Sequence, residues 1–283
     1  MEQGLNTYYY CVAQHLFAVH CADKALFERM SNYEPFRVEA QGEPIFALRI
    51  EQDGLLSEEE RSHYAHVFTD NSEEDMPRIE VYREAIGDGQ LAIGDKGWLM
   101  RVSQIAQSPI CCELQSDKDF TQGVLHIAAG YQDVRFCIDN ALMLMFAFRT
   151  APLMTLEMHA AVVVKGEAMG DRLLAIGKEK SEDWGYLFLG HSGTGKSTHA
   201  RQWLQAFPDA WLLNDDNPVL RVMDDGNVYA HRRIPAPPPA SPRKKCTPTS
   251  APTETGKTTR PSPIWRNCAR PITATARVFT MSC

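Results

Sequence analysis

Residues 190–197 read GHSGTGKS, a complete match to the pattern GxxxxGK(S/T). The apolar run Tyr186–Leu189 comes directly before the match, and the helix-forming stretch Ser197–Phe207 follows it. Glycines let such a loop turn its backbone N–H groups inward around phosphate oxygens, and the N-terminus of the following helix adds partial positive charge. These residues therefore predict a phosphate-binding loop rather than a glycine turn without a ligand.

Within this loop, Lys196 is expected to reach the β- and γ-phosphates of a nucleotide, and the Ser197 hydroxyl to ligate Mg²⁺. The residues expected to contact the nucleotide are Gly190, Ser192, Gly193, Thr194, Gly195, Lys196, Ser197 and Thr198.

An acidic partner for the magnesium ion follows further along the chain. Asn214-Asp215-Asp216 stands at the end of the short apolar strand expected at Trp211–Leu213. Because open α/β sheets bind ligands at the carboxyl ends of their strands, the two carboxylates are predicted to face the phosphate loop. The alternative is an ordinary Asx turn, which the sequence Asn217-Pro218 also favours.

His159 lies in the run TLEMHAAVVV, residues 155–164, which is interpreted as one strand. A histidine in such a strand is either a core residue or a catalytic one, and Glu157 would share its strand face and could orient it. His191, inside the loop, and His199, on the following helix, are interpreted as incidental.

The chain is expected to have three parts. Short alternating or apolar runs predict a β-rich N-terminal region over residues 1–130. The expected strands are Tyr8–Val12, Ile45–Ile50, Ile79–Tyr82, Trp98–Val102, Ile110–Leu114 and Val124–Ile127. Leu55–Phe68 predicts a helix with Ser57 as its N-cap, and Asp70–Asp75 a solvated loop.

Residues 131–230 predict an α/β core around the glycine-rich loop. A helix is expected over Val134–Phe148, ended by Pro152, and another over Lys196–Phe207. The expected strands are Thr155–Val164, Arg172–Ile176, Tyr186–Leu189 and Trp211–Leu213, followed by a hairpin of Val219–Met223 and Asn227–Tyr229.

Residues 231–283 differ in composition from the rest of the chain. They hold ten of the seventeen prolines, nine threonines, and ten basic residues against the single acid Glu254. So few aliphatic residues cannot offset the entropy of ordering, which predicts a disordered basic tail. An out-of-frame translation is an equal alternative, because the change is abrupt.

Overall composition excludes several classes of protein. The net charge of −7 argues against broad binding to a nucleic-acid backbone. The N-terminus lacks the features of a signal peptide, and the longest apolar run, Ala141–Phe148, falls short of the ~20 residues of a membrane span. The eight cysteines show no metal-ligand spacing, which predicts reduced, mostly buried thiols in a cytoplasmic protein without a structural zinc site.

The order of these features resembles the HPr kinase/phosphorylase family. The resemblance is carried by His159 on a strand, a gap of about thirty residues, the loop at 190–197, a helix, and a short strand ending in Asp215-Asp216. It covers residues 134–223. The same features are similar to the ATP-dependent phosphoenolpyruvate carboxykinases, which share that fold. The implied fold is an α/β P-loop kinase core with a mixed sheet.

The resemblance implies a role for each matching residue. Lys196 and the loop would bind the phosphates of ATP, and Ser197 with Asp216 would hold Mg²⁺. Asp215 would take the proton from an acceptor hydroxyl, and His159 would lie beside the transferring phosphoryl group. HPr kinases phosphorylate a serine of a small carrier protein, and more distant relatives phosphorylate other hydroxyls. Members of the family continue with further strands and basic residues, so for this chain we expect weak or absent transfer.

Three other readings stay open. A nucleotide-binding regulatory protein would bind Mg-ATP through Lys196 without turnover, and a structural fragment would not bind nucleotide. An ABC-type ATPase has a similar loop, but it also needs an LSGGQ-like signature and a strand ending in Asp-Glu, which the sequence lacks. Carboxykinase activity would need further basic and metal-ligating residues.

Overall fold

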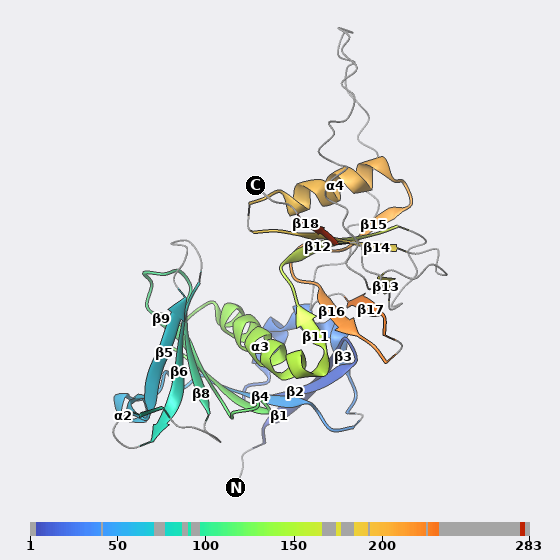
Figure 1. Cartoon of the computed structure of the whole chain (residues 1–283). Coiled ribbons are helices and arrows are strands. Elements are labelled where there is room, and N and C mark those ends of the chain that lie inside the picture. The colour runs from blue at the N-terminus through green and yellow to red at the C-terminus, as the bar shows by residue number, and fades with distance from the viewer. Residues whose placement is uncertain are drawn as a thin grey trace. The chain divides into compact units, whose positions relative to one another are not determined.

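The computed structural model describes residues 4–40, 42–70, 77–86, 90–91, 97–165, 174–176, 184–191, 193–224, 226–231 and 278–280. In these ranges the protein is mixed α/β and rich in strands (Figure 1). Its chain divides into two compact units, Met1–Leu153 and Met154–Cys283.

The first unit is built on a ten-stranded mixed sheet in the order β3-β1-β2-β4-β10-β9-β8-β6-β5, with β7 paired to β6. Its strands are β1 (Asn6–Val12), β2 (His15–Cys21), β3 (Arg37–Val38), β4 (Phe46–Glu51), β5 (Tyr64–Asp70), β6 (Arg78–Ile86), β7 (Gln90–Leu91), β8 (Trp98–Ser103), β9 (Ile110–Ser116) and β10 (Gln122–Ile127). Its helices are α1 (Ala25–Arg29), η1 (Ser31–Phe36), α2 (Glu58–Ser62), α3 (Val134–Thr150) and η2 (Ala151–Leu153). β4 runs parallel to β2 and β10, and the other pairs are antiparallel.

The six strands predicted in this region are confirmed as β1, β4, β6, β8, β9 and β10. Strand β2 was not predicted; it pairs with β1 through a two-residue turn. That turn consists of Ala13 and Gln14, whose φ angles are 49° and 62°. Such hairpin turns favour Asn or Gly because both central residues have positive φ. A turn made by alanine and glutamine therefore carries no sequence signal.

The helix predicted over Leu55–Phe68 is wrong beyond its first turn. Ser57 is the N-cap as expected, and it forms a capping box with Glu60, but α2 ends at Ser62. The remainder is β5, an edge strand paired with β6. Backbone pairing with β6 outweighs the helical pattern, because that strand satisfies the N–H and C=O groups that a helix would satisfy locally. The loop predicted at Asp70–Asp75 lies, apart from Asp70, outside the described residues.

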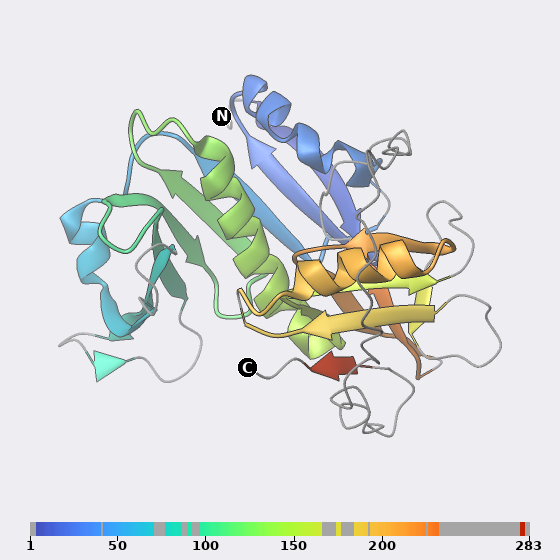
Figure 2. The same ribbon diagram turned by 90° about the horizontal axis from the view of Figure 1, so that it is seen from above.

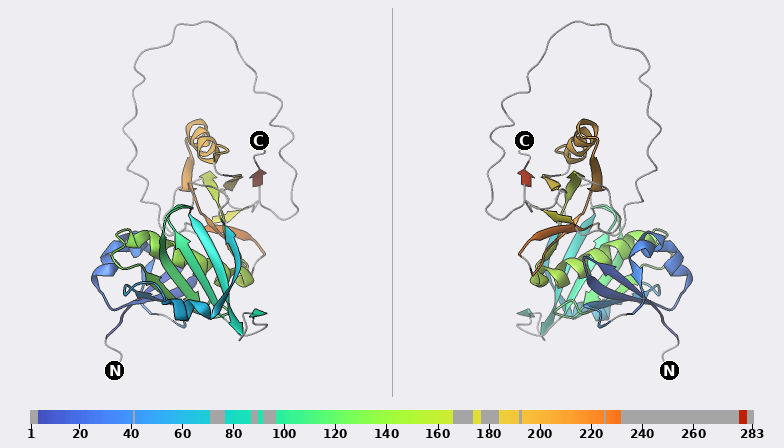
Figure 3. Two further views of the ribbon diagram at one scale, coloured as in Figure 1. Left: turned by 90° about the vertical axis from the view of Figure 1, so that its left-hand side faces the viewer. Right: turned by 90° about the vertical axis from the view of Figure 1, so that its right-hand side faces the viewer.

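The helix predicted at Val134–Phe148 is confirmed as α3, which lies across one face of the first sheet (Figure 3). Its buried residues recur at helical spacing: Val134, Cys137, Ile138, Ala141, Leu142, Met145, Phe146 and Thr150. Because α3 packs on β4, β9 and β10, the boundary between the units falls after Leu153 rather than at residue 130.

One helical stretch in the described ranges, Val134–Leu153, is long and apolar enough to cross a membrane by length and composition. It is α3 with η2, and the buried side of α3 faces the sheet.

The second unit contains two four-stranded sheets, ordered β15-β12-β14-β18 and β11-β16-β17-β13. Its elements are β11 (Thr155–Glu157), β12 (Ala160–Lys165), β13 (Leu174–Ile176), β14 (Trp184–Leu189), α4 (Lys196–Ala206), β15 (Ala210–Asn214), β16 (Val219–Val222), β17 (Val228–His231) and β18 (Val278–Thr280). α4 covers one face of the first of these sheets (Figure 2), where Ala161, Val163, Phe188 and Ala200 pack together. On the other face, Val162, Leu187 and Leu213 pack with Ala230 of β17.

The predictions of α4, β14, β15 and the β16–β17 hairpin are confirmed. β13 matches the end of the strand predicted at Arg172–Ile176, whose first two residues lie outside the described ranges. The single strand predicted over Thr155–Val164 is wrong: the chain bends at Met158 and His159, and β11 and β12 belong to different sheets.

The tail predicted over residues 231–283 lies mostly outside the described ranges. His231 ends β17, and Val278–Thr280 forms β18, which pairs parallel to β14.

Candidate functional site

Three chain segments meet at one edge of the sheet β15-β12-β14-β18. Both β14 and β15 run antiparallel to β12, which lies between them, so they are parallel to each other. The glycine-rich loop of residues 190–197 leaves the end of β14, Asp215-Asp216 follows the end of β15, and His159 directly precedes β12. The register places Leu189 opposite Ala160 and Asn214 opposite Val162. The described residues among those predicted for one site thus lie at the same edge of this sheet.

The glycine-rich loop makes a compact turn from β14 into α4. Gly193 and Gly195 have φ angles of 77° and 94°, in the left-handed region that a side chain strains, so glycine is required at both positions. The Thr194 hydroxyl donates to the carbonyl of His191 over 2.8 Å, which closes the turn. Helix α4 begins at Lys196, so Lys196, Ser197 and Thr198 form its first turn. Ser192 lies outside the described residues.

Lys196 is the one lysine or arginine of the loop, and its side chain folds back over the backbone of Gly190 and His191. Its Nζ donates to the carbonyls of Gly190 and His191, both over 2.8 Å. The residue is only 8% exposed. An ammonium has three N–H donors, and these bonds use two of them. The lysine therefore braces the loop from inside while its charge stays at the N-terminus of α4.

Asp215 and Asp216 are held by a turn that Asn214 organises. The buried Asn214 side chain accepts from the backbone N–H groups of Asp216, over 2.8 Å, and Asn217, over 3.1 Å. The Asx turn considered from the sequence is thus present, but it belongs to Asn214. Both aspartates are exposed, and the side chain of Asp216 is 74% accessible. The turn presents the carboxylates outward and is compatible with a role in binding.

His159 is exposed and is not a core histidine. It sits in the bend before β12, where Ala160 N donates to the carbonyl of Asp216 over 2.8 Å and Met158 N to that of Pro218 over 3.0 Å. These bonds fix the bend against the Asn214 turn. His159 Nε2 lies 3.9 Å from Asp216 Oδ1, close enough for an ion pair when the ring is protonated.

The orientation expected from Glu157 is wrong. β11 ends at Glu157, before the bend, so Glu157 and His159 do not share a strand face. Asn214, which positions the two aspartates, was not among the predicted site residues. The sequence did indicate this role, because an Asn side chain often accepts a hydrogen bond from the backbone N–H of the residue two positions later, which forms an Asx turn.

The arrangement combines a cation, backbone N–H groups at a helix N-terminus, two outward carboxylates and an imidazole. The first two favour an anion, and the carboxylate oxygens suit a hard divalent cation. No protein-family model and no curated protein matches the chain. The functional assignment therefore depends on this geometry.

Proposed function

We propose that the second unit is a P-loop kinase core, similar to that of the HPr kinase/phosphorylase family, which binds ATP and Mg²⁺ and transfers a phosphoryl group to a hydroxyl only at the weak rate expected from the sequence. One observation carries the proposal: β14 and β15 lie on either side of β12 and run parallel to each other. The glycine-rich loop and the two aspartates therefore follow strands that end at the same edge of the sheet, where His159 precedes β12. In open α/β sheets ligands bind at the carboxyl ends of the strands, and β14 and β15 both end at this edge.

The residues at this edge fit a nucleotide phosphate and its metal. The turn at Gly193 and Gly195 has open space where a Cβ would stand at Gly193, so a phosphate can approach the backbone closely there. Lys196 would donate to phosphate oxygens with its remaining N–H, or by exchanging a loop carbonyl for phosphate. The Ser197 hydroxyl and an Asp216 carboxylate oxygen are hard donors of the kind that Mg²⁺ prefers.

The chemistry follows from the placement of these side chains. Mg²⁺, when bound, neutralises charge on the phosphates. Asp215, exposed at the end of the turn, would accept the proton of the attacking hydroxyl. Asp216 would help to hold the metal, and the His159 ring beside it would stabilise charge on the transferring group. Transfer of this kind needs mainly positioning and charge neutralisation.

The acceptor is a hydroxyl on a protein or on a small molecule. The net charge of −7 supports an acceptor other than nucleic acid. We place the activity in the cytoplasm, where ATP and reduced thiols coexist.

Calorimetric titration with Mg-ATP tests binding, the first part of the proposal. Lys196→Ala should weaken binding at least about tenfold, because a charge-assisted hydrogen bond to phosphate contributes ~1.5–3 kcal/mol. Lys165→Ala is the matched control. Lys165 is the last residue of β12, and the site lies at the opposite end of that strand. Removing the Lys165 side chain should therefore leave the affinity for Mg-ATP unchanged. Equal affinity of wild type and Lys196→Ala would refute the proposed site.

Transfer is tested by following ADP release with water, free serine and a serine-bearing carrier protein as acceptors. Asp215→Asn should lower the rate by ~10²–10⁴-fold while Mg-ATP still binds, because the base is lost and the phosphate contacts remain. Asp216→Asn should raise the Mg²⁺ concentration needed for half-maximal rate. Tight Mg-ATP binding with no ADP release from any acceptor would favour a nucleotide-binding regulatory protein instead.

A further inference from the structure

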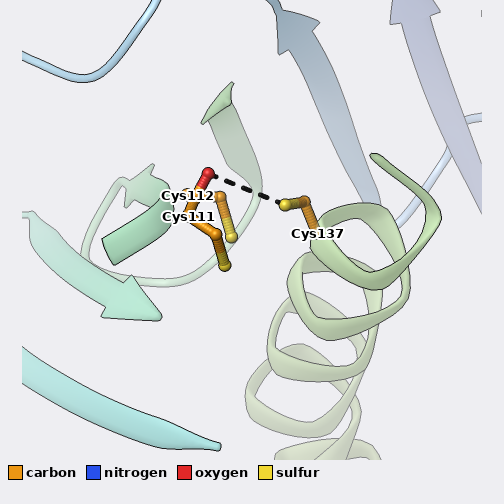
Figure 4. Close-up of side chains that lie close together, drawn as sticks. All are labelled: Cys111, Cys112 and Cys137. Atoms are coloured by element: carbon orange, nitrogen blue, oxygen red, sulfur yellow. Dashed lines mark hydrogen bonds between the residues drawn. The ribbon is translucent and has the colours of Figure 1, made fainter. Parts of the chain in front are cut away.

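Three cysteines gather in the core of the first unit, whereas the proposed nucleotide site belongs to the second unit. Cys111 and Cys112 lie on β9 and Cys137 lies in the first turns of α3 (Figure 4). Their three Sγ atoms all lie within 4.8 Å of one another. The residues are 2%, 1% and 0% exposed, and all carry free thiols.

A β-bulge explains how two adjacent strand residues reach one cluster. Side chains of neighbouring residues in a regular strand point to opposite faces of the sheet. Here β8 and β9 change register: Val102 pairs with Cys112 and Ser103 with Ile110, so Cys111 is the extra residue of β9. A bulge of this kind turns two consecutive side chains toward the same side, and bulges are features that re-aim side chains. Helix α3 then supplies the third sulfur.

We propose that Cys111, Cys112 and Cys137 form a binding site for one Cu⁺ ion, coordinated by three sulfurs. Soft thiolate ligands select Cu⁺, Zn²⁺ or iron–sulfur clusters. Zn²⁺ sites in proteins are almost always four-coordinate, and iron–sulfur clusters take four cysteines. No His, Asp or Glu of the described ranges joins the three sulfurs, which favours the ion that accepts the lowest coordination number.

The spacing of the three sulfurs suits a bound cation. Metal–sulfur bonds of about 2.3 Å around a trigonal ion bring the sulfurs to about 4 Å from one another, so small rotations of the side chains suffice. Binding displaces the thiol protons to solvent, while copper keeps its oxidation state and no electron is transferred.

The test uses the reduced full-length chain with Cys246, Cys268 and Cys283 changed to serine, so that no thiol of residues 232–283 competes. Anaerobic titration with Cu⁺ against a Cu⁺-specific chelator should give one equivalent per chain. Cys137→Ser should weaken the affinity by at least about 100-fold, since even residues that only support a ligand contribute 10–100-fold. Cys21→Ser is the matched control, because Cys21 is equally buried but on β2, outside the cluster; it should bind as the parent does.

A second measurement needs no substitution at a ligand position, so it remains informative even if Cys137→Ser does not fold. The X-ray absorption spectrum of the copper-loaded parent chain should show a first shell of three sulfurs and no nitrogen or oxygen. Substoichiometric binding, a first shell containing nitrogen or oxygen, or unchanged affinity in a folded Cys137→Ser chain would each overturn the proposal. So would Zn²⁺ alone binding as tightly as Cu⁺.

Discussion

Single histidines in this protein differ in ways that their sequence neighbours do not indicate. His159 sits in an apolar run and yet is exposed in a bend, where its side chain is 50% accessible. His231, the last residue of β17, is followed in the sequence by two arginines, yet its imidazole Nε2 is buried with no hydrogen-bond partner in the described ranges. Burial, with a smaller effect of the Arg221 charge, lowers the pKa of His231 to about 4.

The His231 pKa predicts acid sensitivity of the second unit. An unfolded chain binds the proton near pH 6.5 and the folded chain only near pH 4, so stability is complete above pH 6.5 and falls as the pH drops toward 4. At pH 5 the free energy of unfolding should be about 2 kcal/mol lower than at pH 7. Urea unfolding at the two pH values measures this difference, and His231→Gln should make it smaller. Replacing the exposed His66 by glutamine should leave the slope as in wild type; the same slope in His231→Gln would contradict the assignment.

Among the elements, local signals mark where a segment starts better than where it ends. The Ser57 capping box starts α2 as its sequence indicates, with Glu60 N donating to Ser57 Oγ and Ser57 N donating to the Glu60 carboxylate over 2.8 Å. The helical pattern of the sequence continues past Ser62, but residues Tyr64–Asp70 form strand β5, which pairs with β6. The partners of β5 lie on another strand, from Tyr64 opposite Glu84 to Asp70 opposite Ile79, and such pairing cannot be read from the local pattern because it depends on the register of the whole sheet.

Loss of the cap should weaken α2 measurably. Ser57→Ala removes the oxygen that accepts from Glu60 N, and a lost N-cap typically costs about 1 kcal/mol. Ser57→Thr keeps the acceptor and is the matched control. Urea denaturation of both variants gives the comparison, and an alanine variant as stable as the threonine variant would show that the capping bonds contribute nothing.

At the scale of the whole molecule, two units each carry a core of their own. In the first, Phe17, Leu48, Leu125 and Met145 are buried together with the inner face of α3. In the second, β12 is buried on both faces, by α4 on one side and the β16–β17 hairpin on the other. Each unit thus has the packed interior that independent folding requires.

Truncation after the first unit should leave a folded protein. Residues 1–153 keep α3 on the sheet and should unfold cooperatively in urea, with near-ultraviolet circular dichroism showing fixed aromatic side chains. Residues 1–130, which end before α3, expose the apolar face that the helix covers and should lose cooperative unfolding. Equal cooperativity of the two fragments would show that α3 is not part of the first core.

Local sequence was sufficient for features that depend on residue type and near neighbours. The glycines of the loop at 190–197 predict its turn because only glycine tolerates the φ angles found at Gly193 and Gly195. Alternating apolar residues likewise predict most strands, since period and burial are coupled within a strand. In the candidate site, the loop was recognisable from its glycines, and the aspartates from their position at the end of the apolar strand β15.

Other features depend on contacts between distant segments and appear only once the chain is folded. The break between β11 and β12 exposes His159, and it exists because the two strands join different sheets. The bulge that gathers the three cysteines arises from the register of β9 against β8, and α3 adds Cys137 across the core. Register and packing are properties of whole sheets, and a sequence window reports only the preference of its own residues.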